Sequence, residues 1–100
     1  MQLLPQGIAN TIPPLYTTEK TPVERKVLYA KFFDPFTQWT WFACEYDPEK
    51  RLFFGYVIGQ EKEFGYFSLD ELESLKMPDG TTRIERDVNF ASISFKDLNL

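Results

Sequence analysis

The sequence predicts a small α+β domain: an antiparallel β-meander of four to five strands, one main helix, and short helical turns near both ends of the chain. Two observations predict this class. Four runs rich in β-branched and aromatic residues follow one another through short connections, and one stretch with helical spacing comes directly after them. A chain of 100 residues has room for one ordinary domain, so these elements are expected to share a core.

The four β-rich runs are predicted to be consecutive antiparallel strands. They span residues 27–33, 39–47, 51–59 and 63–67. The first two runs end at Asp34-Pro35 and Asp47-Pro48, pairs in which the Asp side chain caps a type I turn and the proline presets φ. Such short links favour antiparallel neighbours, because a parallel crossover needs about a dozen residues or more.

A helix is predicted over residues 68–76, directly after the meander. Ser68 and Glu71 have the spacing of a capping box, in which the Ser oxygen accepts from an unpaired helix N–H and the Glu side chain reaches back. Three leucines then share one face at helical spacing: Leu69, Leu72 and Leu75. This face is expected to pack on the sheet.

The two flanks complete the predicted domain. Residues 83–90 alternate apolar and charged side chains, which is typical of a strand. Ser94 with Asp97 predicts a final short helical turn. The expected order is an N-terminal segment (1–26) that docks on the sheet, the meander (27–67), the helix (68–76) and a fifth strand (83–90).

The composition excludes several activities. The chain has one cysteine and no histidine, and its net charge is −4 with a pI near 4.8. One cysteine cannot form an intrachain disulfide, and the lack of histidine removes Ser-His and Cys-His nucleophile pairs and nearly all catalytic zinc sites. The basic residues are scattered among acids, so a basic face for nucleic acid is not expected. No cofactor and no metal are predicted.

The sequence also predicts a cytoplasmic protein without membrane contact. Its longest uncharged stretches are much shorter than the roughly 20 apolar residues that cross a bilayer. The first residues, MQLLPQGIAN, lack the basic region of a signal peptide. A lone cysteine without an export signal fits a reducing compartment.

The aromatic run 39–47 admits two interpretations. Strict alternation would place Trp39, Trp41, Ala43 and Glu45 on one face and Thr40, Phe42, Cys44 and Tyr46 on the other. Both faces would then be apolar, which predicts a sheet covered on both sides: on one by the helix, on the other by the N-terminal segment or a partner. Core packing is therefore favoured over a platform that stacks single-stranded nucleic acid through Trp39, Trp41 or Tyr56 beside lysines.

Four carboxylates form pairs at i, i+2 spacing on predicted strands: Glu45 with Asp47, and Glu85 with Asp87. If the two pairs met, their oxygens could bind Mg²⁺ or Mn²⁺ and support a metal-dependent phosphodiesterase or nuclease. The simpler interpretation is that they are solvated acids at strand ends, or that Glu45 pairs with Arg83 or Arg86.

The favoured hypothesis is a non-catalytic module that binds another protein through an acidic surface. Exposed carboxylates at strand ends would meet a basic partner, and a tryptophan would serve as the anchor. The residues expected to take part are Trp39, Glu45, Asp47, Glu61, Glu63, Glu85 and Asp87. The module is expected to be a monomer or a homodimer.

Six motifs, taken together, resemble one family. They are PPLY (13–16), KFF (31–33), WTWFACEYD (39–47), LFFGYV (52–57), EFGYFSLDEL (63–72) and IERDVNF (84–90). In this order and spacing, the chain resembles the small bacterial proteins grouped as domain of unknown function 2958. The resemblance implies a setting on plasmids, conjugative elements or phages. It implies an accessory role there, such as inhibition of a host defence or regulation of a replication or transfer enzyme, and no catalytic mechanism.

Overall fold

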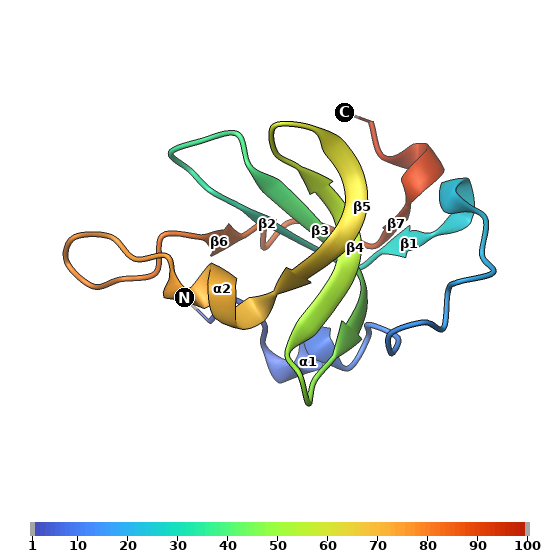
Figure 1. Cartoon of the computed structure of the whole chain (residues 1–100), viewed down its shortest axis with the longest axis horizontal. Helices are drawn as coiled ribbons and strands as arrows, with labels where there is room; N and C mark the ends of the chain where they lie inside the picture. Colours follow the sequence, from blue (N-terminus) through green and yellow to red (C-terminus); the bar gives the residue numbers. More distant parts are fainter. Residues whose placement is uncertain (1, 100) are drawn as a thin grey trace.

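A computed structural model describes residues 2–99 and shows a small α+β fold built on one main sheet (Figure 1). All neighbouring strands of this sheet are antiparallel, in the order β5-β4-β3-β2-β6. Its strands are β2 (Ala30–Phe33), β3 (Thr40–Asp47), β4 (Leu52–Ile58), β5 (Lys62–Ser68) and β6 (Glu85–Arg86). The predicted fold class is confirmed.

The remaining elements are short. A two-stranded sheet pairs β1 (Val27–Leu28) with β7 (Ile93–Ser94). The helices are α1 (Gln6–Ala9) and α2 (Leu69–Ser74), and two 3₁₀ turns are η1 (Val23–Arg25) and η2 (Phe95–Asp97).

The outermost predicted strands differ from those observed. The run 27–33 divides at Tyr29 into β1 and β2, which belong to different sheets. Leu28 and Ala30 would share a face in a straight strand, but they lie in two different core clusters, so the chain turns over between them. The predicted strand 83–90 pairs with β2 only at β6, because the Asp87 carboxylate accepts from the Asn89 N–H and bends the chain there.

A β-bulge at Cys44 changes which side chains face which side of the sheet. Ala43 pairs with Gly55 and Glu45 pairs with Phe54, so Cys44 has no partner on β4. Beyond the bulge the alternation is inverted. The predicted faces are therefore wrong for Glu45 and Tyr46: Tyr46 packs with Ala43 in one cluster, and Glu45 lies on the opposite side.

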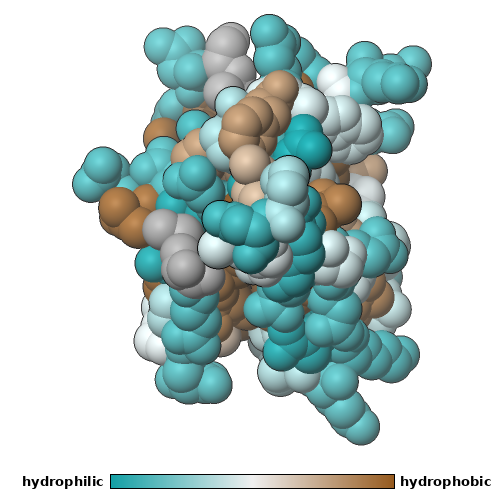
Figure 2. Space-filling model, turned by 90° about the vertical axis from the view of Figure 1, so that its left-hand side faces the viewer, coloured by the Kyte–Doolittle hydropathy of each residue, from teal (hydrophilic) through white to brown (hydrophobic). Residues whose placement is uncertain are grey.

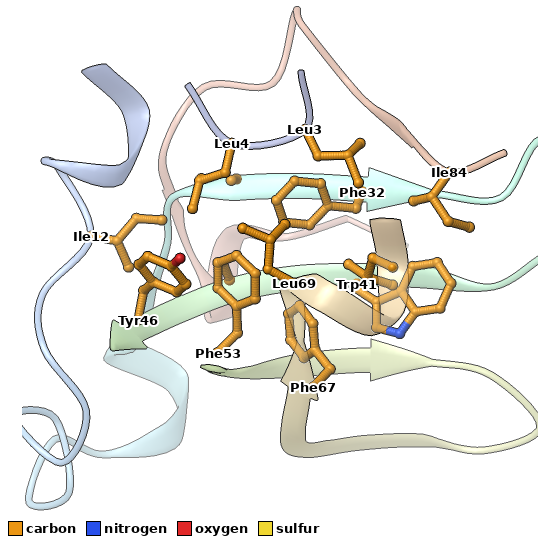
Figure 3. Packing of buried hydrophobic residues seen from close by; sticks show 13 residues of the cluster. Leu3, Leu4, Ile12, Phe32, Trp41, Tyr46, Phe53, Phe67, Leu69 and Ile84 are labelled. Atoms are coloured by element: carbon orange, nitrogen blue, oxygen red, sulfur yellow. The ribbon is translucent and has the colours of Figure 1, made fainter. Parts of the chain in front are cut away.

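One side of the sheet, here called the helix face, carries the larger core (Figure 3). Its centre is Phe53, whose ring contacts those of Phe32, Tyr46 and Phe67. Helix α2 contributes Leu69 and Leu72, and the N-terminal segment contributes Leu3, Leu4 and Ile12. The helix and the first part of the N-terminal segment thus cover the same face, whereas the sequence suggested opposite faces. Only the later part of the segment, with Tyr16 and Lys26, lies against the opposite face.

The other side, here called the C-terminal face, is covered by the end of the chain. Its buried centre consists of Leu28, Phe42 and Cys44. Phe90, Phe95 and Leu98 from the C-terminal segment pack against it. Burial of the apolar residues of both central strands explains why these strands lack a clean apolar–polar alternation.

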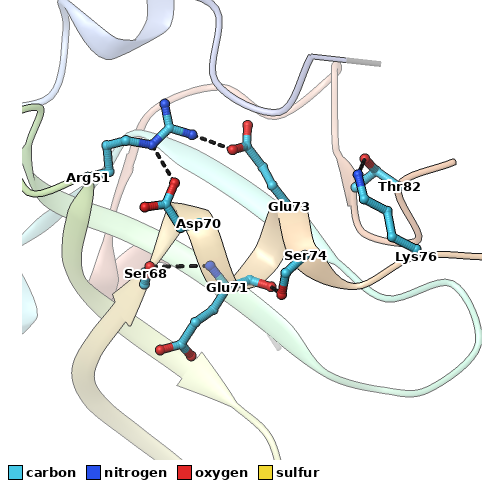
Figure 4. Close-up of polar contacts among 8 residues, drawn as sticks. All are labelled: Arg51, Ser68, Asp70, Glu71, Glu73, Ser74, Lys76 and Thr82. Atoms are coloured by element: carbon cyan, nitrogen blue, oxygen red, sulfur yellow. Dashed lines mark hydrogen bonds and ion pairs between the residues drawn. The ribbon is translucent and has the colours of Figure 1, made fainter. Parts of the chain in front are cut away.

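Turn and cap chemistry joins β5 and the β3–β4 hairpin to α2 (Figure 4). The Ser68 hydroxyl accepts from the Glu71 N–H at 3.3 Å, as the capping box predicts. At the end of the β3–β4 turn, Arg51 has a positive φ of 53° and pairs with Asp70 and Glu73 of α2. The helix ends at Ser74, two residues earlier than predicted.

Candidate functional site

One of the aromatic residues at the surface is Trp39, directly before β3. Its ring stacks on that of Trp41 with centroids 5.9 Å apart, and it covers Gly59 at the end of β4. A Cβ on Gly59 would lie 2.3 Å from two Trp39 ring atoms, so the ring needs this glycine. Trp41 is buried, whereas Trp39 remains 39% exposed. The stacked pair therefore holds one rigid indole at the surface.

Trp39 lines three hollows. One of about 400 Å³ is bordered by Val57, Gly59, Gln60, Glu61 and Glu63. A second, of about 330 Å³, lies between the two tryptophans and α2, where Glu71 and Leu75 contribute. The third, of about 340 Å³, includes Leu75 and Arg83. Because α2 stops at Ser74, Leu75 leaves the helical face and is 43% exposed, which corrects the prediction that it packs with Leu69 and Leu72.

Here we call this region the Trp39 surface: Trp39, Trp41, Leu75, Glu61, Glu63 and Glu71. Its three carboxylates belong to exposed residues. Among residues 2–99, no lysine or arginine forms an ion pair with any of them. The surface thus combines an exposed ring with uncompensated negative charge.

Arg83, the cation that lines the third hollow, is already engaged. It pairs with the buried Asp34 at 3.0 Å and lies over the exposed Phe36 ring at 5.3 Å. Burial raises the pKa of Asp34, but hydrogen bonds from Arg83, the Phe36 N–H and Thr37 outweigh it, and the pKa is lowered overall. Arg83 therefore neutralises Asp34 and leaves the Trp39 surface acidic.

Figure 2 shows the side of the molecule that carries the loops on the left of Figure 1. Hydrophilic residues dominate this side, and hydrophobic residues form separate patches between them. Separate hydrophobic residues on a surface are normal, so the hydropathy of this side does not by itself indicate a binding site.

Glu45 is not at the surface, contrary to the prediction. It is 3% exposed and holds the N-terminal loop. Its carboxylate accepts from the Tyr16 N–H at 2.8 Å, from the Thr18 N–H at 2.9 Å and from the Thr18 hydroxyl. It pairs with neither Arg83 nor Arg86. The bulge at Cys44 causes this placement, because it turns Glu45 toward the C-terminal face.

Glu45 lines a cleft of about 300 Å³, here called the Glu45 cleft, with Tyr16, Glu19, Lys26, Phe54 and Tyr66. Lys26 is buried, donates to the Thr18 carbonyl and lies 5.8 Å from the centre of the Phe54 ring. Tyr16 has a positive φ of 73°, which is uncommon for an aromatic residue. The polar groups of the cleft thus serve mainly to hold the N-terminal loop.

Cys44, next to Glu45, is buried within the apolar cluster of the C-terminal face. Burial raises the pKa of its thiol above the usual value. Its Sγ lies 3.8 Å from the Thr18 hydroxyl. A neutral thiol in this position has a packing role, as the sequence suggested.

The other predicted site residues lie apart from the Trp39 surface. Asp47 caps the β3–β4 turn by accepting from the Glu49 N–H at 3.0 Å. Glu85 and Asp87 border a hollow of about 420 Å³ beside β6, where Asp87 pairs with Lys31 at 3.7 Å. Within residues 2–99, no three His, Cys, Asp or Glu side chains form a group able to hold a metal ion, so the four carboxylates proposed as a cluster do not converge.

Three of the seven predicted residues therefore lie together: Trp39, Glu61 and Glu63. Sequence reasoning missed Glu71 and Leu75, which depend on where α2 ends. It also missed Tyr16 and Lys26, which the fold brings to the Glu45 cleft. The capping role of Ser68 was the one available indication, because it fixes the start of α2 beside β5.

The geometry does not favour the nucleic-acid alternative. Trp41 is buried, Tyr56 packs against Phe42, Phe64 and Phe95, and the accessible Trp39 is bordered by carboxylates. Among the helices of residues 2–99, none has the length and apolar character needed to span a membrane.

Comparison with known proteins gives one finding. A family described as "Protein of unknown function (DUF2958)" matches residues 10–95, which includes every strand of the main sheet and α2. Neither the curated proteins nor the solved structures gave a match. Because the match covers most of the 100 residues, the chain belongs to the DUF2958 family.

Proposed function

We propose that this chain is a non-catalytic module that binds a basic segment of another protein at the Trp39 surface. The observation that carries the proposal is the stacked, partly exposed Trp39 among three hollows, bordered by carboxylates that have no ion-pair partner within residues 2–99. Large aromatic side chains held in place before binding are typical anchors of protein interfaces.

The charge of the Trp39 surface argues for the kind of partner. Glu61, Glu63 and Glu71 would attract lysine or arginine, and complementary charge speeds encounter. The hollow between the tryptophans and α2 is mainly apolar in its lining and would take an aliphatic or aromatic side chain. The partner segment is thus one with an apolar residue flanked by basic residues.

The resemblance to proteins of mobile elements suggests where such a module would act. We propose that it inhibits a host-defence protein or regulates an enzyme of replication or transfer. Both roles need a small, acidic, rigid domain that occupies a basic surface, and neither needs a catalytic group.

The test is a comparative capture experiment with a purified follow-up. Tagged wild-type chain, Trp39→Ala and a Glu61→Lys/Glu63→Lys double variant are incubated with nuclease-treated host lysate, and retained proteins are identified by mass spectrometry. We expect one protein to be retained by the wild type and lost by both variants. Titration of that purified protein should then quench tryptophan fluorescence, with affinity falling as salt rises.

A matched control changes the same charge elsewhere. Glu24 and Glu49 are exposed and lie away from the Trp39 surface, so a Glu24→Lys/Glu49→Lys variant should retain the protein as the wild type does. Equal retention by all four proteins, or loss in the control as well, would contradict the proposal. Circular dichroism of each variant verifies the fold.

A further inference from the structure

We infer that β5 is a self-association edge, at which two copies of the chain pair their β5 strands antiparallel about a two-fold axis at Gly65. Such pairing would join the two main sheets into one. It uses the backbone of β5 and does not depend on the function proposed for the Trp39 surface.

The ladder with β4 shows which backbone groups of β5 are unused. The Leu69 N–H donates to the Arg51 carbonyl, and the Gly59 N–H donates to the Glu61 carbonyl, both at 2.9 Å. In an antiparallel ladder, hydrogen-bonded pairs alternate with non-bonded pairs, so the odd-numbered residues of β5 bond to β4. The N–H and C=O groups that point away from β4 belong to Lys62, Phe64, Tyr66 and Ser68. Within residues 2–99, these groups have no bond to another strand or loop, but the Ser68 carbonyl, as the N-cap carbonyl of α2, accepts the first hydrogen bond of that helix.

The two edges of the main sheet differ in how they are protected. The β6 edge is two residues long. The β5 edge runs for seven residues, contains no proline and follows β4 without a register shift (Figure 1). Edges of monomeric sheets are usually shortened, bulged or interrupted by proline, and a long regular edge is suited to pairing with another strand.

A second copy fits this edge in one full-length register. Two strands can exchange hydrogen bonds only between residues whose backbone groups point outward, and a two-fold axis at Gly65 satisfies this for all four. It places Lys62 opposite Ser68 of the second copy and Phe64 opposite Tyr66. The two Phe64–Tyr66 pairings each exchange two hydrogen bonds. The two Lys62–Ser68 pairings each form one, from the Ser68 N–H to the Lys62 carbonyl, which gives about six in total. Axes centred on Phe64 or Tyr66 would leave one end of the strand unpaired.

The side chains agree with this register. Phe64 and Tyr66 would form cross-strand aromatic pairs, which stabilise sheets. Lys62 would face the start of α2 of the second copy, whose first turn contains Asp70 and Glu71. No like charges lie directly opposite, and a Cβ at Gly65 would have no neighbour within 4 Å, so the axis is free of obstruction.

The first measurement is the oligomeric state of the full chain by sedimentation velocity from micromolar to millimolar concentration, combined with amide hydrogen exchange. We expect a monomer–dimer equilibrium. The amides of Phe64, Tyr66 and Ser68 should become protected as concentration rises. Those of Glu63, Gly65 and Phe67 should be protected at every concentration, since they bond to β4.

Tyr66→Pro tests the backbone directly. It removes one outward donor and no bond to β4, so the fold should persist, as proline is tolerated at edge positions with a solvent-facing N–H. We expect the dissociation constant of the dimer to rise about tenfold to a hundredfold, because two interface hydrogen bonds are lost per dimer. The matched control Tyr66→Ala removes the ring but keeps the N–H, and should have a smaller effect.

A chain that stays monomeric at all concentrations would overturn the inference. So would a dimer in which the amides of Phe64, Tyr66 and Ser68 keep exchanging freely, since that dimer would use another surface. If Tyr66→Pro fails to fold, the exchange pattern of the wild type alone decides between these outcomes. Loss of a protein partner in the Trp39→Ala variant has no bearing on any of these measurements.

Discussion

The Glu45 cleft and the Trp39 surface use the same kinds of residue for opposite purposes. Each combines aromatic rings with carboxylates. In the cleft, Glu45 is buried and accepts three hydrogen bonds from the N-terminal loop, so its charge is satisfied within the fold. At the Trp39 surface, the carboxylates have no ion-pair partner among residues 2–99. An acidic residue therefore indicates a binding surface only where the fold leaves it unsatisfied.

The largest effect that tests this difference is expected when one glutamate in each region is replaced by glutamine, which exchanges a carboxylate oxygen for an amide nitrogen. We expect Glu45→Gln to lower the free energy of unfolding by about 3 kcal/mol, because its amide nitrogen would meet N–H donors that then lack an acceptor. Glu63→Gln should change it by less than about 0.5 kcal/mol. Urea unfolding measures both. Equal effects would mean that the N-terminal loop is not held by Glu45.

A smaller effect is expected where the Trp39 ring is supported. Gly59→Ala should lower the free energy of unfolding by about 2 kcal/mol, because a Cβ 2.3 Å from the Trp39 ring forces the ring to move. Gly65→Ala is the matched control, since nothing lies within 4 Å of its Cβ. Urea unfolding and tryptophan emission are the measurements. An unshifted emission in Gly59→Ala would show that the indole is not fixed by this contact.

The border of the Trp39 surface should be sensitive to acid. The pKa of Asp34 is lowered in the folded protein from its ordinary value of 3.8, so its contribution to stability is present above that value. This contribution is lost as the pH falls below 3.8 toward the lower pKa of the folded protein, because the unfolded state binds more protons in this range. Asp34→Asn should lower stability at neutral pH by about 1 kcal/mol and reduce the dependence of stability on pH below about pH 4. A slope equal to that of the wild type would argue against the Arg83 pair.

The smallest effect on stability is expected from the surface acids themselves. Replacing Glu61, Glu63 and Glu71 together by Gln should change the free energy of unfolding by less than about 0.5 kcal/mol per site. The same variant should weaken binding of the captured protein and its dependence on salt. Calorimetric titration at two salt concentrations checks this. Unchanged binding would show that these three charges take no part in the proposed recognition.

The sequence was most informative where local chemistry decides the structure. The Asp-Pro turns, the central strands and the Ser68 cap follow from short patterns, and the structure contains each of them. Trp39, Glu61 and Glu63 lie together because β3 and β5, which flank β4, begin at the same end of the sheet.

The bulge at Cys44 could not be predicted in this way. The run WTWFACEYD is apolar on both faces, so a bulge that shifts the register by one residue cannot be recognised from its hydrophobic pattern. Glu45 consequently appeared exposed and near Asp47. The contacts of Tyr16 and Lys26 were missed for a related reason: they depend on which strand edge the N-terminal loop meets, and sequence spacing carries no information about that.

The hold of Glu45 on the N-terminal loop also has a consequence for the order of folding. Its bonds join residues 29 and 27 positions apart in the chain, whereas the β3–β4 and β4–β5 hairpins join near neighbours. Contacts with low sequence separation form faster, because closing a short loop costs less entropy. We therefore expect the meander to form first and the N-terminal segment, although synthesised before it, to attach last. Native exchange should show the amides of Tyr16 and Thr18 opening before those of β4.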